Sequence, residues 1–304
     1  MVKGRFAPSP TGRMHLGNVF CALLSWLSAK SQGGEWLLRI EDLDPQRSRK
    51  EYADQLMSDL EWLGLTWDNT PVWQSNRGEI YEHYLQKLRE LHLIYPCFCT
   101  RADIMATQAP HESDGRVVYK GTCRPKGGAL AEEPTTPATL RMMVQDAVIP
   151  FCDGHYGRHD INLTEHCGDY IVRRKDGAWA YQLAVVVDDA LMGVTEIVRG
   201  RDLLLSSPQQ IHLRRVLFAD DPSVPSDLHF FHHPLLCNTQ GLRLCKRDKA
   251  MDLEYLRANG TSPQAVTGRL AHLAGLIPEP VPLRPETLLK DFSRGKVPTE
   301  DIIV

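Results

Sequence analysis

The first residues that could do chemistry lie in a loop between two apolar stretches near the N-terminus. The segment FAPSPTGRMHLGN, residues 6–18, contains two prolines, two glycines and several polar side chains. A glycine-bearing loop that follows a strand and enters a helix at Gly17 presents backbone N–H groups to an anion, most often phosphate. The segment matches neither G-x-G-x-x-G nor a Walker loop. It therefore predicts a phosphate-binding loop of another type, with an elaborate strand–helix turn as the alternative.

Two groups of side chains could bind zinc. The first group is Cys97, Cys99 and Cys123, and the second is Cys152, His155, His159 and Cys167. Thiolates and imidazoles are the usual zinc ligands, and close cysteines in a reducing compartment hold metal more often than they form disulfides. Spacing alone does not choose between the groups, and cysteines that pack as small apolar side chains are the alternative for both. We expect His229, His232 and His233 to be structural.

Composition limits the class of protein that carries these residues. The chain has 304 residues, 42% of them hydrophobic, which is enough for about two domains. No apolar run approaches the roughly 18 residues of a membrane span, and no leader peptide is evident, so we expect a cytoplasmic protein. A net charge of −3 gives no overall nucleic-acid signal. Any nucleic-acid partner would need a local basic surface.

The elements that position these residues alternate between strand and helix. Strands are predicted over residues 2–7 and 35–40, and helices over 19–30, 47–63 and 77–91. In the first helix, Val19, Leu23, Leu24 and Leu27 share one face. This order predicts a parallel sheet.

Regular structure is not evident from residue 97 to 168, a stretch rich in Pro, Gly, Cys and His that we interpret as an insertion. Residues 169–189 then predict a hairpin that turns at Asp176-Gly177, followed by a strand at 195–198 and a helix at 203–218. A turn at 239–241 leads to helices that end near Leu276. The expected α/β chain has a first catalytic half at 1–95, an insertion at 96–180, a second catalytic half at 181–235 and a helical segment at 236–304.

Four ordered segments resemble the class I aminoacyl-tRNA synthetases in their glutamate-specific form. HLGN at 15–18 resembles the HIGH motif, and RLCKR at 243–247 resembles the KMSKS loop. RIEDLDPQR at 39–47 and VVVDDALMGVTEIVRGRDLL at 185–204 resemble the blocks between them. The resemblance covers most of the chain. It implies a Rossmann-like sheet, an inserted zinc-bearing subdomain, and a ligase that activates L-glutamate with ATP and Mg²⁺.

Length then separates the branches of this family. Glutamyl-tRNA synthetases carry a large anticodon-binding region after the KMSKS loop, whereas 57 residues follow Arg247 here. The chain is most similar to the short glutamyl-Q tRNA(Asp) synthetases, which attach glutamate to queuosine at the wobble position. Val185, where full-length enzymes usually have Asn, supports this branch. The resemblance implies a monomer whose partners are queuosine-containing tRNA(Asp), L-glutamate and ATP.

Two other interpretations stay open. A truncated glutamyl-tRNA synthetase could charge the 3′ end of a tRNA. An inactive tRNA-binding module is the other, and the presence of His15, Lys246, Glu41 and Arg5 argues against it. Basic residues expected to contact RNA phosphates are Arg214, Arg215, Arg243, Arg247 and Lys249.

The resemblance also implies roles for individual residues. The catalytic pair is His15 and Lys246. The residues implied for ATP are Thr11, His15, Gly17, Asn18, Arg243 and Lys246. The residues implied for glutamate are Arg5, Phe6, Ala7, Pro8, Ser9, Glu41, Tyr181 and Arg199. Two arginines and one glutamate match the two carboxylates and one ammonium of the substrate, although the pairing of arginine with carboxylate stays open.

Several residues depart from these assignments or lie beside them. The resemblance implies one structural zinc held by Cys97, Cys99, Tyr119 and Cys123. Cys245 stands where the family usually has Ser, and a thiol is a weaker hydrogen-bonding group than a hydroxyl. The sequence leaves four aspartates undecided between capping, ion pairing and substrate contact, namely Asp42, Asp44, Asp188 and Asp189.

Overall fold

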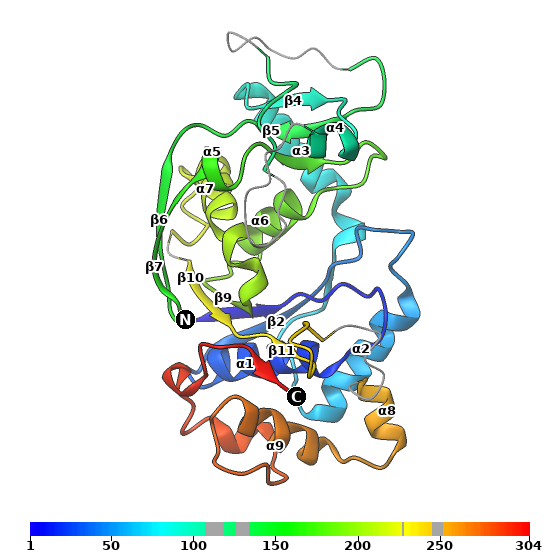
Figure 1. Ribbon diagram of the computed structural model, residues 1–304, viewed down its shortest axis with the longest axis vertical. Coiled ribbons are helices and arrows are strands. Elements are labelled where there is room, and N and C mark those ends of the chain that lie inside the picture. The colour runs from blue at the N-terminus through cyan, green and yellow to red at the C-terminus, as the bar shows by residue number, and fades with distance from the viewer. Residues whose placement is uncertain (107–117, 126–133, 227, 245–251) are drawn as a thin grey trace.

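The computed structural model describes residues 1–106, 118–125, 134–226, 228–244 and 252–304 (Figure 1). Its first half is built from β1 (Lys3–Phe6), α1 (Leu16–Lys30), β2 (Glu35–Ile40), α2 (Lys50–Leu63) and β3 (Val72–Trp73). The three strands form a parallel sheet in the order β1-β2-β3. The predicted parallel sheet is confirmed, and β2 has the predicted bounds.

The helix α2 begins later than residue 47, where the sequence predicts it. The carbonyl of Asp44 accepts the N–H groups of Arg47 and Ser48, at 3.2 and 2.8 Å. These bonds close a turn before the helix starts at Lys50. The turn keeps residues 41–48 at the end of β2.

A second sheet has the order β7-β6-β10-β9. Its strands are β6 (Val148–Asp153), β7 (Gly157–Asn162), β9 (Glu196–Gly200) and β10 (His229–His233). The pairs β9–β10 and β6–β10 are parallel, and β6–β7 is an antiparallel hairpin. Its edge strand β9 starts beside β1, because the N–H of Thr195 donates to the carbonyl of Lys3 at 3.0 Å.

The segment from 97 to 168 is more regular than predicted. It contains β5 (Thr139–Met142), the β6–β7 hairpin and α5 (Leu163–His166). A third, antiparallel sheet of β4 (Ile94–Cys97), β5 and β8 (Tyr170–Arg173) lies at the top of Figure 1. It is flanked by α3 (Gly78–Glu90) and α4 (Arg101–Ala106). The turn formers in this stretch concealed short strands that pair across long distances in the sequence.

The predicted hairpin over 169–189 is half wrong. The turn at Asp176-Gly177 is present, and Arg173 bridges to Trp179 across it. The second arm is instead the helix α6 (Tyr181–Leu191). Every residue from Leu183 to Ala190 is buried. The segment therefore has no solvent-facing side whose polar residues would recur with a helical period in the sequence.

The C-terminal part adds helices, 3₁₀ turns and a separate two-stranded sheet. The 3₁₀ turn η2 (Arg201–Ser206) leads into α7 (Ser207–Phe218), and β11 (Leu236–Cys237) follows β10. Two helices, α8 (Leu253–Ala258) and α9 (Pro263–Leu273), precede the 3₁₀ turns η4 (Pro285–Leu288) and η5 (Arg294–Lys296). The last strand, β12 (Ile302–Ile303), pairs in parallel with β11.

The core around α1 holds these layers together. Leu16, Leu24 and Leu27 are fully buried, and α1 packs against β1, β9 and α9. None of the helices in the described residues is both long and apolar enough to span a membrane. The packing of α1 fixes its N-terminus beside the ends of β1 and β9, where the predicted site residues lie.

Candidate functional site

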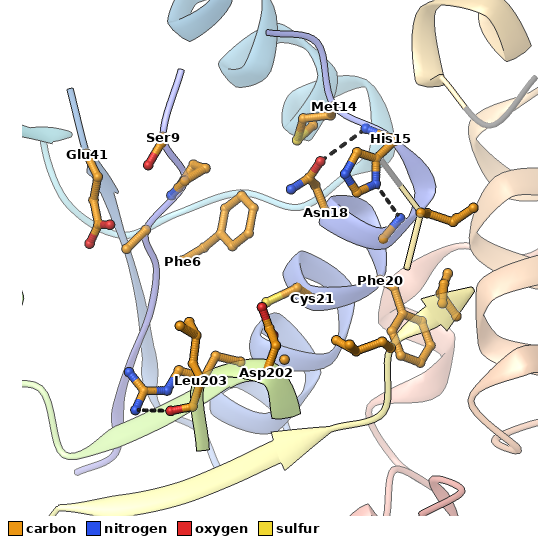
Figure 2. A pocket seen from close by; sticks show the side chains of 18 of the residues that line it. Phe6, Ser9, Met14, His15, Asn18, Phe20, Cys21, Glu41, Asp202 and Leu203 are labelled. Carbon is orange, nitrogen blue, oxygen red and sulfur yellow. Dashed lines mark hydrogen bonds between the residues drawn. The ribbon is translucent and has the colours of Figure 1, made fainter. Parts of the chain in front are cut away.

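A cavity of about 470 Å³ lies beyond the ends of β1 and β9, at the N-terminus of α1 (Figure 2). It is lined by every residue implied for glutamate or ATP that the structure describes: Arg5, Phe6, Ala7, Pro8, Ser9, Thr11, His15, Gly17, Asn18, Glu41, Tyr181, Arg199 and Arg243. Lys246 lies outside the described residues, as do Cys245, Arg247 and Lys249. Leu244, on one side of that gap, lines the cavity, and Leu253, on the other, donates its N–H to the carbonyl of Met14.

His15 caps α1 at the end of the glycine-bearing loop. Its Nδ1 accepts the N–H of Gly17 at 3.1 Å, and its own N–H donates to the side-chain oxygen of Asn18 at 3.2 Å (Figure 2). With Nδ1 as the acceptor, the proton of the neutral ring lies on Nε2, which is then a donor suited to an anion. A Cβ at Gly17 would stand 3.0 Å from the imidazole. Glycine at 17 therefore makes room for the capping histidine.

A buried ion-pair network orients Arg5 and Glu41. Asp189 accepts Nη1 of Arg39 at 2.6 Å and Nε of Arg5 at 3.3 Å, and Glu41 accepts Nη2 of Arg39 at 3.1 Å. Burial alone would raise the pKa of Asp189, but Arg39 and Arg5 outweigh it and hold that pKa below its usual range. For Glu41 burial prevails over Arg39 and Arg5, and its pKa is raised. Within the described residues, the terminal nitrogens of Arg5 keep no side-chain partner.

Arg199 is a buried cation whose contacts in the described residues are all neutral. Its nitrogens donate to the acceptors of Gln210 (2.8 Å), Ser207 (2.9 Å), His232 (3.0 Å), Leu203 (3.3 Å) and Tyr181 (3.5 Å). Only 4% of the residue is exposed, and burial lowers its pKa. A buried guanidinium without a carboxylate is costly unless a ligand supplies one.

His232 fixes the orientation of Arg199. Burial lowers the pKa of His232 to about 4, so its ring is neutral at neutral pH. Its Nδ1 bonds Asp153 at 2.6 Å, which leaves Nε2 to accept from Arg199. The prediction that this histidine is structural fits a positioning role behind the cavity wall.

The undecided aspartates all have partners within the protein. Asp188 accepts from Arg77 at 2.6 Å, and from Gln74 and Tyr81 at 2.8 Å each. Asp42 accepts the N–H and hydroxyl of Ser75. Asp44 accepts the N–H of Gln46 at 3.1 Å and pairs with Arg174 at 3.4 Å. All of these contacts are hydrogen bonds or ion pairs within the protein, like those of Asp189.

Sequence reasoning missed three side chains on the other wall of the cavity. Cys21, Asp202 and His233 line it, and Asp202 pairs with Arg243. Burial raises the pKa of Cys21 to about 11 and lowers that of His233 to about 4, so both are neutral at pH 7. Of the three, Cys21 was the easiest to predict from the sequence, because it lies one helical turn after Gly17.

Three cysteine sulfurs meet at the end of β4. Those of Cys97, Cys99 and Cys123 lie within 4.8 Å of one another. The hydroxyl of Tyr119 is 3.4 Å from the sulfur of Cys97 and 3.7 Å from that of Cys99. Burial opposes ionisation of Cys123, but the N–H of Phe98 and the Tyr119 hydroxyl hold its pKa at about 7. Three thiols around a phenol oxygen fit a closed tetrahedral metal site.

The rival group is not assembled. Cys152 directs its sulfur to the carbonyl of Asp153, and Cys167 directs its sulfur to that of Leu205. His155 bonds the carbonyl of Pro298, and the ring of His159 stacks on Phe151. In the described part of the chain, the three cysteines near β4 are the only group that could hold a metal.

One expected RNA contact is wrong. Arg214 is 8% exposed and donates to the carbonyl of Pro225 at 2.8 Å. Its position on the inner face of α7 keeps it from an RNA phosphate. Arg215, its exposed neighbour, lies beside a different cavity from the one at α1.

Comparisons with known proteins agree with this geometry. The family model described as tRNA synthetases class I (E and Q), catalytic domain, matches residues 1–279. The chain is 45% identical to a glutamyl-Q tRNA(Asp) synthetase of Symbiobacterium thermophilum, over 99% of this chain and 95% of that protein. It is 42% identical to one of Nitratidesulfovibrio vulgaris, over 100% and 95%.

Solved structures show the same fold. A glutamate tRNA ligase from Elizabethkingia meningosepticum, in complex with its amino acid, superposes with a TM-score of 0.79 at 27% identity. The glutamate-tRNA synthetase of Elizabethkingia anophelis gives 0.80 at 27%. The matches cover 99% and 100% of this chain, and 66% and 68% of those structures.

Proposed function

Because the chain belongs to the class I tRNA synthetases for glutamate and glutamine, we propose that it activates L-glutamate with ATP and transfers the glutamyl group to queuosine of tRNA(Asp). The observation that carries the amino-acid assignment is the buried Arg199 without a carboxylate partner in the described residues, in one cavity with Arg5 and Glu41. The names of the relatives that match nearly the whole chain support the acceptor.

Glutamate binding follows from the charges on the cavity wall. Arg5 and Arg199 supply forked donors for the two carboxylates, and Glu41 supplies the anion for the ammonium. Asp189 and His232 hold the two arginines in place before the substrate arrives. A ligand carboxylate then pairs with guanidinium groups that folding has already buried.

Activation requires anion stabilisation at the phosphates of ATP. A glutamate α-carboxylate oxygen forms a bond to the α-phosphorus, the bond to the bridging oxygen breaks, and pyrophosphate leaves with the electron pair. In this proposal Nε2 of His15 contacts the phosphates at the positive end of the α1 dipole, and Arg243 and Lys246 neutralise the charge that grows in the transition state. ATP enters as its Mg²⁺ complex.

Transfer uses the adenylate as an acyl donor. A hydroxyl oxygen of the queuosine cyclopentenediol forms the ester bond to the acyl carbon. The bond from that carbon to the phosphate oxygen breaks, AMP leaves with the electron pair, and the hydroxyl proton passes to solvent. The vicinal hydroxyls of the cyclopentenediol offer the same nucleophile as a terminal ribose.

We assign one structural zinc to Cys97, Cys99, Cys123 and Tyr119. When bound, the metal supplies a cross-link between the end of β4 and residues 119–123. The same segment is held from its other side, because Asp169 bonds Arg124 and Tyr95. Zinc here stabilises the inserted subdomain and takes no part in the reaction.

Transfer of radiolabelled glutamate to defined tRNAs tests the proposal. We expect pyrophosphate exchange with glutamate and ATP alone, and labelling of queuosine-containing tRNA(Asp), but not of the same tRNA with guanine at the wobble position. Nuclease digestion should place the label in the anticodon loop. Exchange that requires tRNA would contradict the activation step. Efficient labelling of the 3′ end of tRNA(Glu) would instead support a glutamyl-tRNA synthetase, the reaction named for the two solved structures.

A further inference from the structure

A second cavity of about 450 Å³ adjoins the first and has no role in the reaction described so far. The two cavities share Ser9, Thr11, Glu41 and Tyr181. Ser9 and Glu41 stand side by side in Figure 2, and the N–H of Glu41 donates to the carbonyl of Pro8 at 2.9 Å. A ligand in the second cavity would therefore be separated from glutamate in the first only by these shared side chains.

The far wall of the second cavity is partly aromatic. Leu43, Ile171 and Trp179 line it. The guanidinium of Arg173 covers Trp179 at 4.6 Å from the ring centroid, and Tyr81 packs edge-on at 5.6 Å. Trp179 remains half-buried. An indole supported in this way is a rigid platform on which an unstacked base can lie.

The entrance carries both signs of charge. Asp44, whose side chain is 28% exposed, lines the cavity and pairs loosely with Arg174 at 3.4 Å. Arg174 also pairs with Asp176 at 2.6 Å, so it can release Asp44 and keep a partner. Arg47 is exposed at the same entrance. Ser48 lines the wall with a buried hydroxyl that has no partner among the described residues.

We propose that this second cavity binds the acceptor nucleoside of the RNA, with its base against Trp179 and its alkylammonium at Asp44. The inference rests on the proposed function, since the amine that joins the cyclopentenediol to its base is a secondary alkylamine, protonated at neutral pH. Arg47 and Arg174 contact the flanking phosphates. A terminal adenosine has no such cation, so the carboxylate of Asp44 favours the modified base.

Glu41 has a second consequence in this arrangement. Glu41 lines both cavities, and in the proposed function its carboxylate binds the ammonium of glutamate in the first. The acceptor hydroxyl meets the acyl carbon across that shared wall. The two cavities are therefore successive subsites of one reaction, and the insertion contributes to the second through β8 and the turn before α6.

The test compares Asp44→Asn with Asp176→Asn. Both remove a carboxylate that pairs with Arg174, but only Asp44 lines the cavity. Single-turnover transfer from preformed glutamyl-adenylate to queuosine-containing tRNA(Asp) is measured and divided by the pyrophosphate-exchange rate of the same variant. At a tRNA concentration below saturation, we expect this ratio to fall at least about tenfold in Asp44→Asn, because tRNA binds more weakly, and to stay within about twofold in Asp176→Asn.

Trp179 is tested by Trp179→Leu and Trp179→Phe, with thermal melting to verify that each variant is folded. Phe keeps a stacking face and should retain transfer within about threefold, whereas Leu should lose about tenfold. Equal ratios in Asp44→Asn, Asp176→Asn and the wild type would overturn the subsite. Absence of transfer by the wild type would refute the proposed function itself, so the two failures are distinguishable.

Discussion

Replacing Asp189 with Asn tests whether the cavity depends on the buried network behind it. Asp189 is 3% exposed and accepts from Arg39 at 2.6 Å and from Arg5 at 3.3 Å. Asn has nearly the same volume and keeps one oxygen acceptor, but it carries no charge. The buried guanidinium groups of Arg5 and Arg39 would then lose the carboxylate that they share.

The loss of stability in Asp189→Asn depends on the carboxylate partners that Arg39 retains. Removal of one partner from a buried ion pair costs about 3–5 kcal/mol of unfolding free energy. Arg39 keeps Glu41 at 3.1 Å and Asp188 at 3.8 Å, so we expect the lower end, about 3 kcal/mol. Arg5 loses its only carboxylate partner in the described residues and keeps at most an amide oxygen shared with Arg39, so KM for glutamate should rise at least about tenfold.

The effect also has a defined pH dependence. The pKa of Asp189 is held below its usual range, so its contribution is present at neutral pH and is lost as pH falls through the folded-state pKa. The difference in stability between wild type and Asp189→Asn should therefore shrink in acid.

Urea unfolding followed by tryptophan fluorescence at pH 7 and at lower pH measures both quantities. Asp42→Asn is the matched control, because among the described residues Asp42 accepts only from Ser75, and it should cost less than about 1 kcal/mol. A change below about 1 kcal/mol in Asp189→Asn, or a difference that does not shrink in acid, would refute the reasoning.

Three further predictions concern other parts of the molecule. Glu41→Gln should raise the melting temperature at pH 7, because burial raises the pKa of Glu41 and its ionised form therefore destabilises the folded protein as pH rises. The same variant should lower pyrophosphate exchange at least about 30-fold, and unchanged exchange would show that Glu41 does not bind the ammonium. Metal analysis should find no zinc in Cys99→Ser and one zinc per chain in Cys152→Ser. Cys99→Ser should also destabilise the insertion, since structural zinc contributes about 10 kcal/mol or more to folding free energy. The reverse result would place the zinc at the group of Cys152. Lys246→Ala should lower exchange at least about 10²-fold, and Cys245→Ser should stay within about threefold; a large loss in the serine variant would give the thiol a role of its own.

The sequence predicted the start of the catalytic sheet well because its signals are local. Turn formers bound β1 and α1, and the apolar face of α1 has a helical period. Residues 35–40 are a strand between Gly34 and the polar segment after Ile40. Such boundaries are set within a few residues of the chain, and single-sequence reasoning can use them.

The helix α6 shows where local reasoning fails. Its run of valines has strand propensity, and a helix buried on all sides has no polar face to mark its period. Only its packing against α3, α7 and β8 makes it a helix. The assignment depends on tertiary contacts that no short window contains.

The two zinc candidates make the same point for the site. Both groups have suitable residue types, but β4 and residues 119–123 bring one group together, whereas the β6–β7 hairpin and α5 separate the other. The partners of Asp189 lie 150 and 184 positions away along the chain. Residue types identified candidates, and topology decided among them.

The separation of Arg39 from Asp189 also matters while the chain is being made. A ribosome releases β1, β2 and Arg39 long before α6, so the nascent first half carries a guanidinium whose buried position lacks two of its three carboxylates. That side chain must stay hydrated, which opposes early closure of the sheet around it. The cavity can become dry only after residue 189 has emerged, and Arg199 must wait for His232, 33 residues later. The catalytic core is thus expected to fold late and as one unit, with chaperones meeting an open first half during synthesis.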